Sequence, residues 1–167
     1  MKQKKDRIFT IILFSVYALL LVWIVLFKAS SISDFRYLRC DRNVNFIPFY
    51  YETEVSSHLD ETVLNALVFV PFGVFLSMLG VRVWKTVLLG FAASLTFEAL
   101  QYAFAIGAAD VTDLITNTTG ALLGACAYLL LCKLFRNREK LNRVLNILAC
   151  VGTVVFLGFA AILLIAN

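Results

Sequence analysis

Five apolar segments, each about 20 residues long, follow one another along this chain of 167 residues. A helix of about 20 residues crosses the hydrocarbon core of a bilayer. Hydrophobic residues make up 61% of the chain and charged residues only 16%, whereas about a quarter of a soluble domain is charged. The sequence therefore predicts an all-α integral membrane protein, a single membrane domain over residues 1–167, with about five transmembrane helices at residues 8–27, 62–80, 84–106, 112–135 and 144–166. The first segment is too long for a typical signal-peptide core, so we expect a retained anchor.

The basic residues predict the orientation of these helices. Eleven of the 15 Lys and Arg residues precede the first helix or lie in the second and fourth connections, and four lie in the long loop at residues 28–61. The positive-inside rule then puts the N-terminus in the cytoplasm, and the loop and the C-terminus outside. The net charge of +4 comes from these short clusters, which face anionic lipid, so no nucleic-acid partner is expected.

Polar side chains interrupt the apolar segments at one level. Glu98 and Gln101 lie in the outer half of the third helix, and Asn65 lies about one turn inside the outer end of the second. Asp110, Asp113 and Asn117 begin the fourth helix. Ionisable groups at membrane depth are costly, and they are usually paired, turned inward or functional. These residues predict a shared polar site on the external side.

Helical spacing predicts how the third and fourth helices meet. Glu98 and Gln101 are three residues apart and share a face, with Ser94 one turn deeper. Asp113 and Asn117 continue into a GxxxG pattern at Gly120–Gly124, which lets helices approach closely. We expect the Asp113–Asn117 stripe to pack against the third helix and to bring Glu98 near Asn117.

Other segments are expected to wall the site. Phe69 and Phe72 lie in the second helix beside Pro71. The external loop carries Asn45 in a strongly aromatic stretch, which predicts either an interfacial position or a re-entrant fold over the helices.

Structural roles compete with the functional ones. Asp110 suits a helix N-cap, and Asp113 suits the acidic first turn that a helix dipole favours. Asn117 and Gln101 suit interhelical hydrogen bonds. Glu98 is about two turns from the nearest end of its helix, so its short side chain does not reach water easily, and a functional role is favoured.

Four motifs together resemble the VanZ-like membrane family. They are NxIPF at Asn45, Ile47, Pro48 and Phe49; NxxxFxPFG at Asn65, Phe69, Pro71, Phe72 and Gly73; ExxQ at Glu98 and Gln101; and DxxDxxxNxxG at Asp110, Asp113, Asn117 and Gly120. Each motif is short, but all four occur in the expected order within a core of about residues 45–128.

The resemblance implies a protein of the bacterial cell envelope, in the cytoplasmic membrane. The founding member of the family is associated with low-level resistance to the glycopeptide teicoplanin. One departure concerns Gly107, which stands where family members often carry an Arg three residues before the first Asp. A model that needs a fixed cation beside Asp110 is weakened accordingly.

Three classes of function fit these residues. The favoured one is a non-enzymatic site that binds a membrane lipid, a lipid-linked envelope precursor or a lipoglycopeptide through Asn45, Asn65, Phe69, Phe72, Glu98, Gln101, Asp110, Asp113 and Asn117. The second is an intramembrane enzyme acting on a lipid-linked phosphate or glycan, with Glu98 and Asp113 as acid and base or as ligands of a divalent cation. The third is a structural assembly subunit. No metal or other cofactor is expected, and no nucleophile motif or zinc motif accompanies the carboxylates.

A reporter fused after Asn167 tests the predicted orientation. An odd number of crossings from a cytoplasmic N-terminus should export the reporter, and a tag before the first helix should stay inaccessible from outside. An exported-only phosphatase and a cytoplasm-only fluorescent protein are the two readouts. A fluorescent carboxy-terminal fusion would contradict both the odd helix count and the external position of the polar residues.

Overall fold

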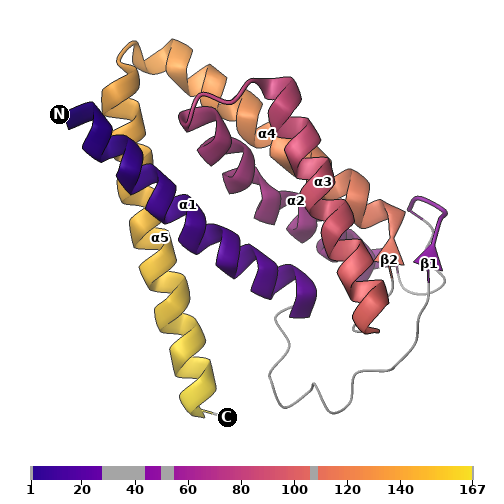
Figure 1. Ribbon diagram of the computed structural model, residues 1–167. Helices are drawn as coiled ribbons and strands as arrows, with labels where there is room; N and C mark the ends of the chain where they lie inside the picture. Colours follow the sequence, from indigo (N-terminus) through magenta and orange to yellow (C-terminus); the bar gives the residue numbers. More distant parts are fainter. Residues whose placement is uncertain (1, 28–43, 50–54, 106–108, 167) are drawn as a thin grey trace.

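The computed structural model describes residues 2–27, 44–49, 55–105 and 109–166 (Figure 1). Its elements are α1 (Lys2–Phe27), β1 (Val44–Asn45), α2 (Val55–Met78), α3 (Val83–Phe104), β2 (Ala109–Asp110), α4 (Val111–Phe135) and α5 (Arg138–Ala166). The all-α prediction with five helices is confirmed, and the two short strands are an addition to it. The Arg residues of the external loop, Tyr50, Tyr51 and Gly107 lie outside the described residues.

The second helix begins earlier than the sequence predicted. The predicted span at residues 62–80 matches the apolar part of α2, Thr62–Met78, but the helix itself begins at Val55, so residues 55–61 of the predicted loop are helical. The polar stretch that precedes Thr62 continues the helix beyond the apolar segment. A helix can project out of a bilayer in this way because its backbone hydrogen bonds are satisfied internally.

Length and composition separate α2 from the other helices. Within the described residues, α1, α3, α4 and α5 each contain an apolar span long enough to cross a membrane, whereas the apolar part of α2 covers Thr62–Met78 and is shorter. Helix α2 buries Phe69, Phe72 and Phe75 against its neighbours. We infer that a shorter apolar length suffices because protein, rather than lipid, covers much of this helix.

Glycines set the contact between α2 and α4. A methyl group added at Gly120 or Gly124 would overlap the backbone carbonyl of Ala66 or Val70 on α2, and one added at Gly73 would overlap the carbonyl of Ala121 on α4. The backbones of the two helices therefore touch. The close approach that the GxxxG pattern predicted is therefore present, and its partner is α2, where both helices carry small residues.

An apolar core fills the space around this contact. Leu21 of α1, Phe69, Phe72 and Leu76 of α2, Phe97 of α3 and Ala121 of α4 form one buried cluster. Helix α1 is also tied to α2 by a polar contact, because the Tyr17 hydroxyl donates to the Val68 carbonyl at 2.5 Å. The first segment thus packs as a full member of the bundle, as expected of an anchor.

Helix α5 packs beside α1 and diverges from the remaining helices along its length (Figure 1). Its contact with α1 extends beyond the first turns, since the rings of Trp23 and Phe156 meet edge-on at a centroid distance of 6.3 Å. Its buried anchors include Leu141 and Asn146, and the Asn146 amide donates to the Thr10 hydroxyl at 2.9 Å. Most of the remaining α5 surface is exposed and apolar, as expected of a lipid-facing helix.

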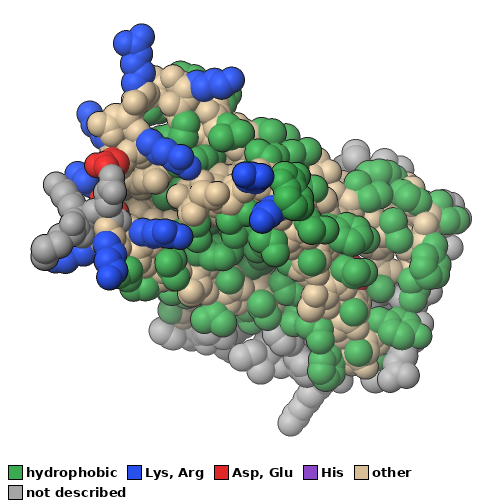
Figure 2. Space-filling model, turned by 45° about the horizontal axis from the view of Figure 1, so that its top comes forward, with side chains coloured by type: hydrophobic (Ala, Val, Ile, Leu, Met, Phe, Trp, Pro, Cys, Tyr) green, Lys and Arg blue, Asp and Glu red, His purple; other side chains and the backbone are tan. Residues whose placement is uncertain are grey.

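The bundle has two chemically different ends. The start of α1, the α2–α3 turn and the α4–α5 turn lie together, and Lys and Arg side chains gather there (Figures 1 and 2). We call this the basic end. The strands β1 and β2, the end of α3 and the start of α4 lie at the opposite end (Figure 1). This arrangement agrees with the predicted alternation of the helices, and the side of the membrane that each end faces stays a prediction.

Replacing Gly124 by Ala should destabilise the protein by about 1–3 kcal/mol, because the new methyl group meets backbone rather than a flexible side chain. Gly158→Ala in α5 is the matched control, since nothing lies within 4 Å of its added methyl group. Thermal unfolding in detergent should show a lower midpoint for Gly124→Ala and an almost unchanged one for Gly158→Ala. Equal midpoints for the two variants would contradict the close α2–α4 contact.

Candidate functional site

The predicted polar residues come together at the end of the bundle opposite the basic end. The strands β1 and β2 pair in parallel, with Val44 opposite Ala109 and Asn45 opposite Asp110. This pairing fastens the α1–α2 connection to the α3–α4 connection. It brings Asn45, which is 65 residues away in sequence, within hydrogen-bond distance of Asp110.

Asp110 is the N-cap of α4. Its Oδ1 accepts a hydrogen bond from the Thr112 N–H at 2.7 Å, and its Oδ2 accepts from the Asn45 side-chain amide at 3.2 Å. The backbone of Asp110 is extended, as an N-cap requires. The capping interpretation is therefore confirmed. Both carboxylate oxygens already have protein partners, and a ligand-binding role for Asp110 stays a prediction.

The NxIPF motif folds as a turn against the same helix start. The Asn45 Oδ1 accepts from the Ile47 N–H at 3.0 Å, and the Phe49 N–H donates to the Thr112 hydroxyl at 3.0 Å. Phe49 adopts a left-handed backbone with φ of 57°, which is uncommon for a non-glycine residue. This motif accordingly has a local structural explanation, and residues 44–49 form a strand and turn at the head of α4.

Glu98 is buried in this network and is only 6% exposed. Its Oε2 accepts a hydrogen bond from the Asp110 N–H at 2.8 Å. This bond links the last turns of α3 to the first residue before α4. Glu98 thus lies beside the start of α4, and it has further interactions besides this one.

Asp113 joins α4 to α2. Its Oδ1 accepts from the Asn65 amide at 2.6 Å, so Asn65 faces the site and not the lipid. The backbone carbonyl of Asp113 accepts from the Thr116 hydroxyl at 3.2 Å and lies 3.5 Å from the Ser94 hydroxyl of α3. The first turn of α4 therefore connects three helices, and Asp113 remains half-buried.

The deepest polar contact joins α3 and α4. The Asn117 amide donates to the Ser94 hydroxyl at 2.9 Å, and Asn117 is 1% exposed. The expected α3 contact of the Asp113–Asn117 stripe is therefore present. Its partner is Ser94, one turn deeper than Glu98 on the same helix.

Two buried amide oxygens lack hydrogen-bond partners among the described residues. They are Oδ1 of Asn117 and Oε1 of Gln101. The other end of the Gln101 amide is fixed, since its Nε2 donates to the Val25 carbonyl at the end of α1 at 3.0 Å. A buried polar group without a partner costs about 1–3 kcal/mol, so these two oxygens call for an explanation.

The two phenylalanines lie deeper than the sequence suggested. Phe69 is fully buried, and its ring meets that of Phe97 edge-on at a centroid distance of 6.3 Å. Phe72 packs against Phe69 and against Phe14 of α1. Both rings belong to the apolar core beneath the polar network, and direct contact with a ligand stays a prediction for them.

The donors described above for the three carboxylates are backbone N–H groups and Asn amides. Among the described residues, no group of three or more His, Cys, Asp and Glu side chains is arranged to hold a metal ion. The carboxylates and the two amide oxygens of the described part of the site are hydrogen-bond acceptors.

Sequence reasoning missed three members of the network. Thr112 receives the Phe49 N–H, the Val25 carbonyl receives Gln101, and the Ile47 N–H closes the turn at Asn45. Backbone groups leave no sequence signal. The hydroxyl of Thr112, two residues after a cap, was the one visible hint.

Comparison with known proteins identifies the family of this chain. The family described as VanZ/LLP1 matches residues 14–136, from α1 to the end of α4, and contains all the site residues named above. The chain is 38% identical over 137 residues to "Protein VanZ" of Enterococcus faecium, which covers 80% of this chain and 81% of that protein. No solved structure matches significantly. With its four motifs joined in one network and most of its length matched, this chain belongs to the VanZ/LLP1 family.

Proposed function

We propose that this multi-pass protein resides in the bacterial cytoplasmic membrane, binds a lipid-linked envelope component or a lipoglycopeptide at the end of the bundle opposite the basic end, and thereby lowers sensitivity to teicoplanin. The observation that carries the proposal is the pair of buried amide oxygens at Gln101 and Asn117, one on each side of the Glu98 level. Groups of this kind are satisfied by a ligand or by ordered water.

The chemistry of the network favours a particular kind of head group. The amide oxygens of Gln101 and Asn117 are acceptors, and they lie among the carboxylates of Glu98, Asp110 and Asp113. Hydroxyl and amino groups, which are abundant on glycans and glycopeptides, donate to such acceptors. A bare phosphate brings only further negative charge, so we expect the glycan or peptide portion of the ligand to enter the network.

The surface around the network suits the apolar portion of such a ligand. Phe46, Ile47 and Phe49 of the β1 turn are 76%, 58% and 53% exposed, and Phe104 at the end of α3 is 69% exposed. Aromatic and aliphatic side chains at a membrane interface contact acyl chains and head groups together. An amphiphile can therefore rest its tail on this surface while its head reaches Asn65 and Asp113.

Glu98→Gln should leave the protein folded and lower its protection against teicoplanin. Gln retains a carbonyl oxygen for the Asp110 N–H and removes the charge, so stability should change little or rise by about 1 kcal/mol. Glu98→Leu should lower the protection further. It leaves the Asp110 N–H without its acceptor, which should lower the free energy of unfolding by about 1–3 kcal/mol. Growth inhibition by teicoplanin is measured in a susceptible host at matched membrane abundance.

Two controls separate the site from general effects. Glu139→Gln removes a carboxylate at the basic end, and Thr96→Leu places a leucine at an exposed position of α3. Both should keep wild-type protection. If both Glu98 variants also keep it, Glu98 is a structural strut, and the binding site proposed around it is wrong.

A chemical assay distinguishes binding from turnover. Purified protein in detergent is incubated with teicoplanin or with a lipid-linked glycan, and the ligand is then recovered and weighed by mass spectrometry. A binding protein returns the ligand unchanged and shows a raised unfolding midpoint in its presence. A cleaved or modified ligand that depends on Glu98 and Asp113 would replace the binding proposal by the enzymatic one.

A further inference from the structure

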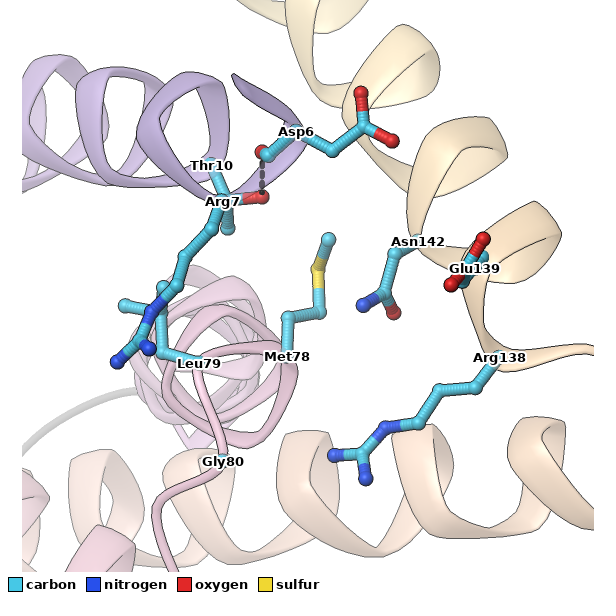
Figure 3. A pocket seen from close by; sticks show the side chains of 9 residues that line it. All are labelled: Asp6, Arg7, Thr10, Met78, Leu79, Gly80, Arg138, Glu139 and Asn142. Atoms are coloured by element: carbon cyan, nitrogen blue, oxygen red, sulfur yellow. Dashed lines mark hydrogen bonds between the residues drawn. The ribbon is translucent and has the colours of Figure 1, made fainter. Parts of the chain in front are cut away.

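A second site candidate lies at the basic end, far from the network around Glu98. A cavity of about 450 Å³ opens between the first turns of α1, the end of α2 with its following turn, and the first turns of α5 (Figure 3). This volume lies within the range of small-molecule sites, about 300–1,000 Å³. It is lined by Asp6, Arg7, Thr10, Met78, Leu79, Gly80, Arg138, Glu139 and Asn142. We call it the basic-end cavity.

Two guanidinium groups border this cavity from different helices. Arg7 extends from α1 past Leu79, and Arg138 extends from the start of α5 beneath Met78 (Figure 3). Arg138 is held in place, since its Nε donates to the Tyr128 hydroxyl at 3.0 Å, its Nη2 donates to the Ser77 carbonyl at 3.4 Å, and its guanidinium lies 5.6 Å from the centre of the Tyr128 ring. The other terminal nitrogen, Nη1, keeps its donors for a ligand. Fixed guanidinium groups bind phosphate oxygens well because their donors form a planar fork.

The same hydrogen bonds orient a third donor. Because Tyr128 accepts from Arg138, its own proton goes to the Asn142 Oδ1 at 2.8 Å. The remaining end of the Asn142 amide is therefore a donor, and the side chain points into the space between the two arginines (Figure 3). Arg7, Arg138 and Asn142 together present donors to one volume.

One acidic residue of the lining, Asp6, is engaged by a cation outside the lining. Asp6 forms an ion pair with Arg143 at 3.5 Å, and its carboxylate points toward α5 (Figure 3). Glu139 also has an interaction of its own. The surrounding surface carries further Lys and Arg side chains (Figure 2).

We propose that the basic-end cavity binds the phosphate head group of an anionic membrane phospholipid. Its three donors match a phosphodiester. Its position at the ends of membrane helices matches the head-group level, where basic pockets between helices bind anionic lipids. Exposed Ile8 and Ile11 on α1, beside the cavity, continue into the apolar surface that the acyl chains would cover. This lipid site is separate from the envelope-ligand site proposed above.

Retention of lipid by the purified protein tests the proposal. The wild-type protein in detergent is mixed with equal amounts of phosphatidylglycerol and phosphatidylcholine, and bound lipid is counted by native mass spectrometry. Phosphatidylglycerol should be retained preferentially. Arg7→Gln and Arg138→Gln should each weaken it about fivefold, the effect of one cation near an anionic lipid.

Arg82→Gln is the matched control. Arg82 is an exposed arginine at the same end, outside the cavity, and its side chain makes no capping bond to α3. It should retain phosphatidylglycerol as the wild type does. Unfolding midpoints show whether each variant is folded. Arg138→Lys keeps the charge but loses the planar fork of donors. Its retention of phosphatidylglycerol should therefore lie between that of the wild type and that of Arg138→Gln.

Three results would overturn the proposal. Equal retention of the two lipids would remove head-group selectivity, and an equal loss in Arg82→Gln would show diffuse surface charge rather than a site. If inorganic phosphate displaces the lipid at a concentration comparable to that of the lipid, the cavity binds a soluble anion. None of these readouts depends on teicoplanin, so the failure of this proposal and the failure of the proposed function are distinguishable.

Discussion

The backbone contact between α2 and α4 is the constraint on which the rest of this structure depends. Gly73, Gly120 and Gly124 remove the side chains that would otherwise separate the two helices. Across the same pair of helices Asn65 donates to Asp113 at 2.6 Å, and the Phe69 ring is fully buried in the core. In a bilayer, where apolar surface gains little from burial against another helix, such close van der Waals packing is a main source of cohesion.

Much of the fold could be predicted from the sequence, because the bilayer imposes strong rules. Five helices, their alternation and the clustering of cations at one end follow from apolar length and from the basic residues. The predicted span at residues 62–80 matched the apolar part of α2, whereas the extension back to Val55 was not predicted, because a helix does not end where hydrocarbon ends. The parallel pairing of Asn45 with Asp110 could not be foreseen, since a two-residue bridge between connections leaves no periodic signal.

The candidate site, too, could be predicted only in part from the sequence. Helical spacing predicted that five polar residues lie at one level of the membrane: Asn65, Glu98, Gln101, Asp113 and Asn117. Which of them bond to one another could not be predicted, because hydrogen bonds to backbone groups, such as Glu98 to the Asp110 N–H and Gln101 to the Val25 carbonyl, depend on how the helices dock. The role of Asp110 illustrates the limit: sequence left capping and ligand binding open, and the structure shows a complete cap.

The chain of bonds from Asn45 through Asp110 to Glu98 has a consequence for how its parts can be measured. Asn45 holds the carboxylate of Asp110, and the backbone of Asp110 holds Glu98. Residues that share partners in this way behave as one energetic unit, and their substitution energies do not add. The summed losses of the single variants at Asn45 and Glu98 should therefore differ from the loss of the double variant, and that difference, obtained from a thermodynamic cycle, is the coupling that the β1–β2 bridge provides.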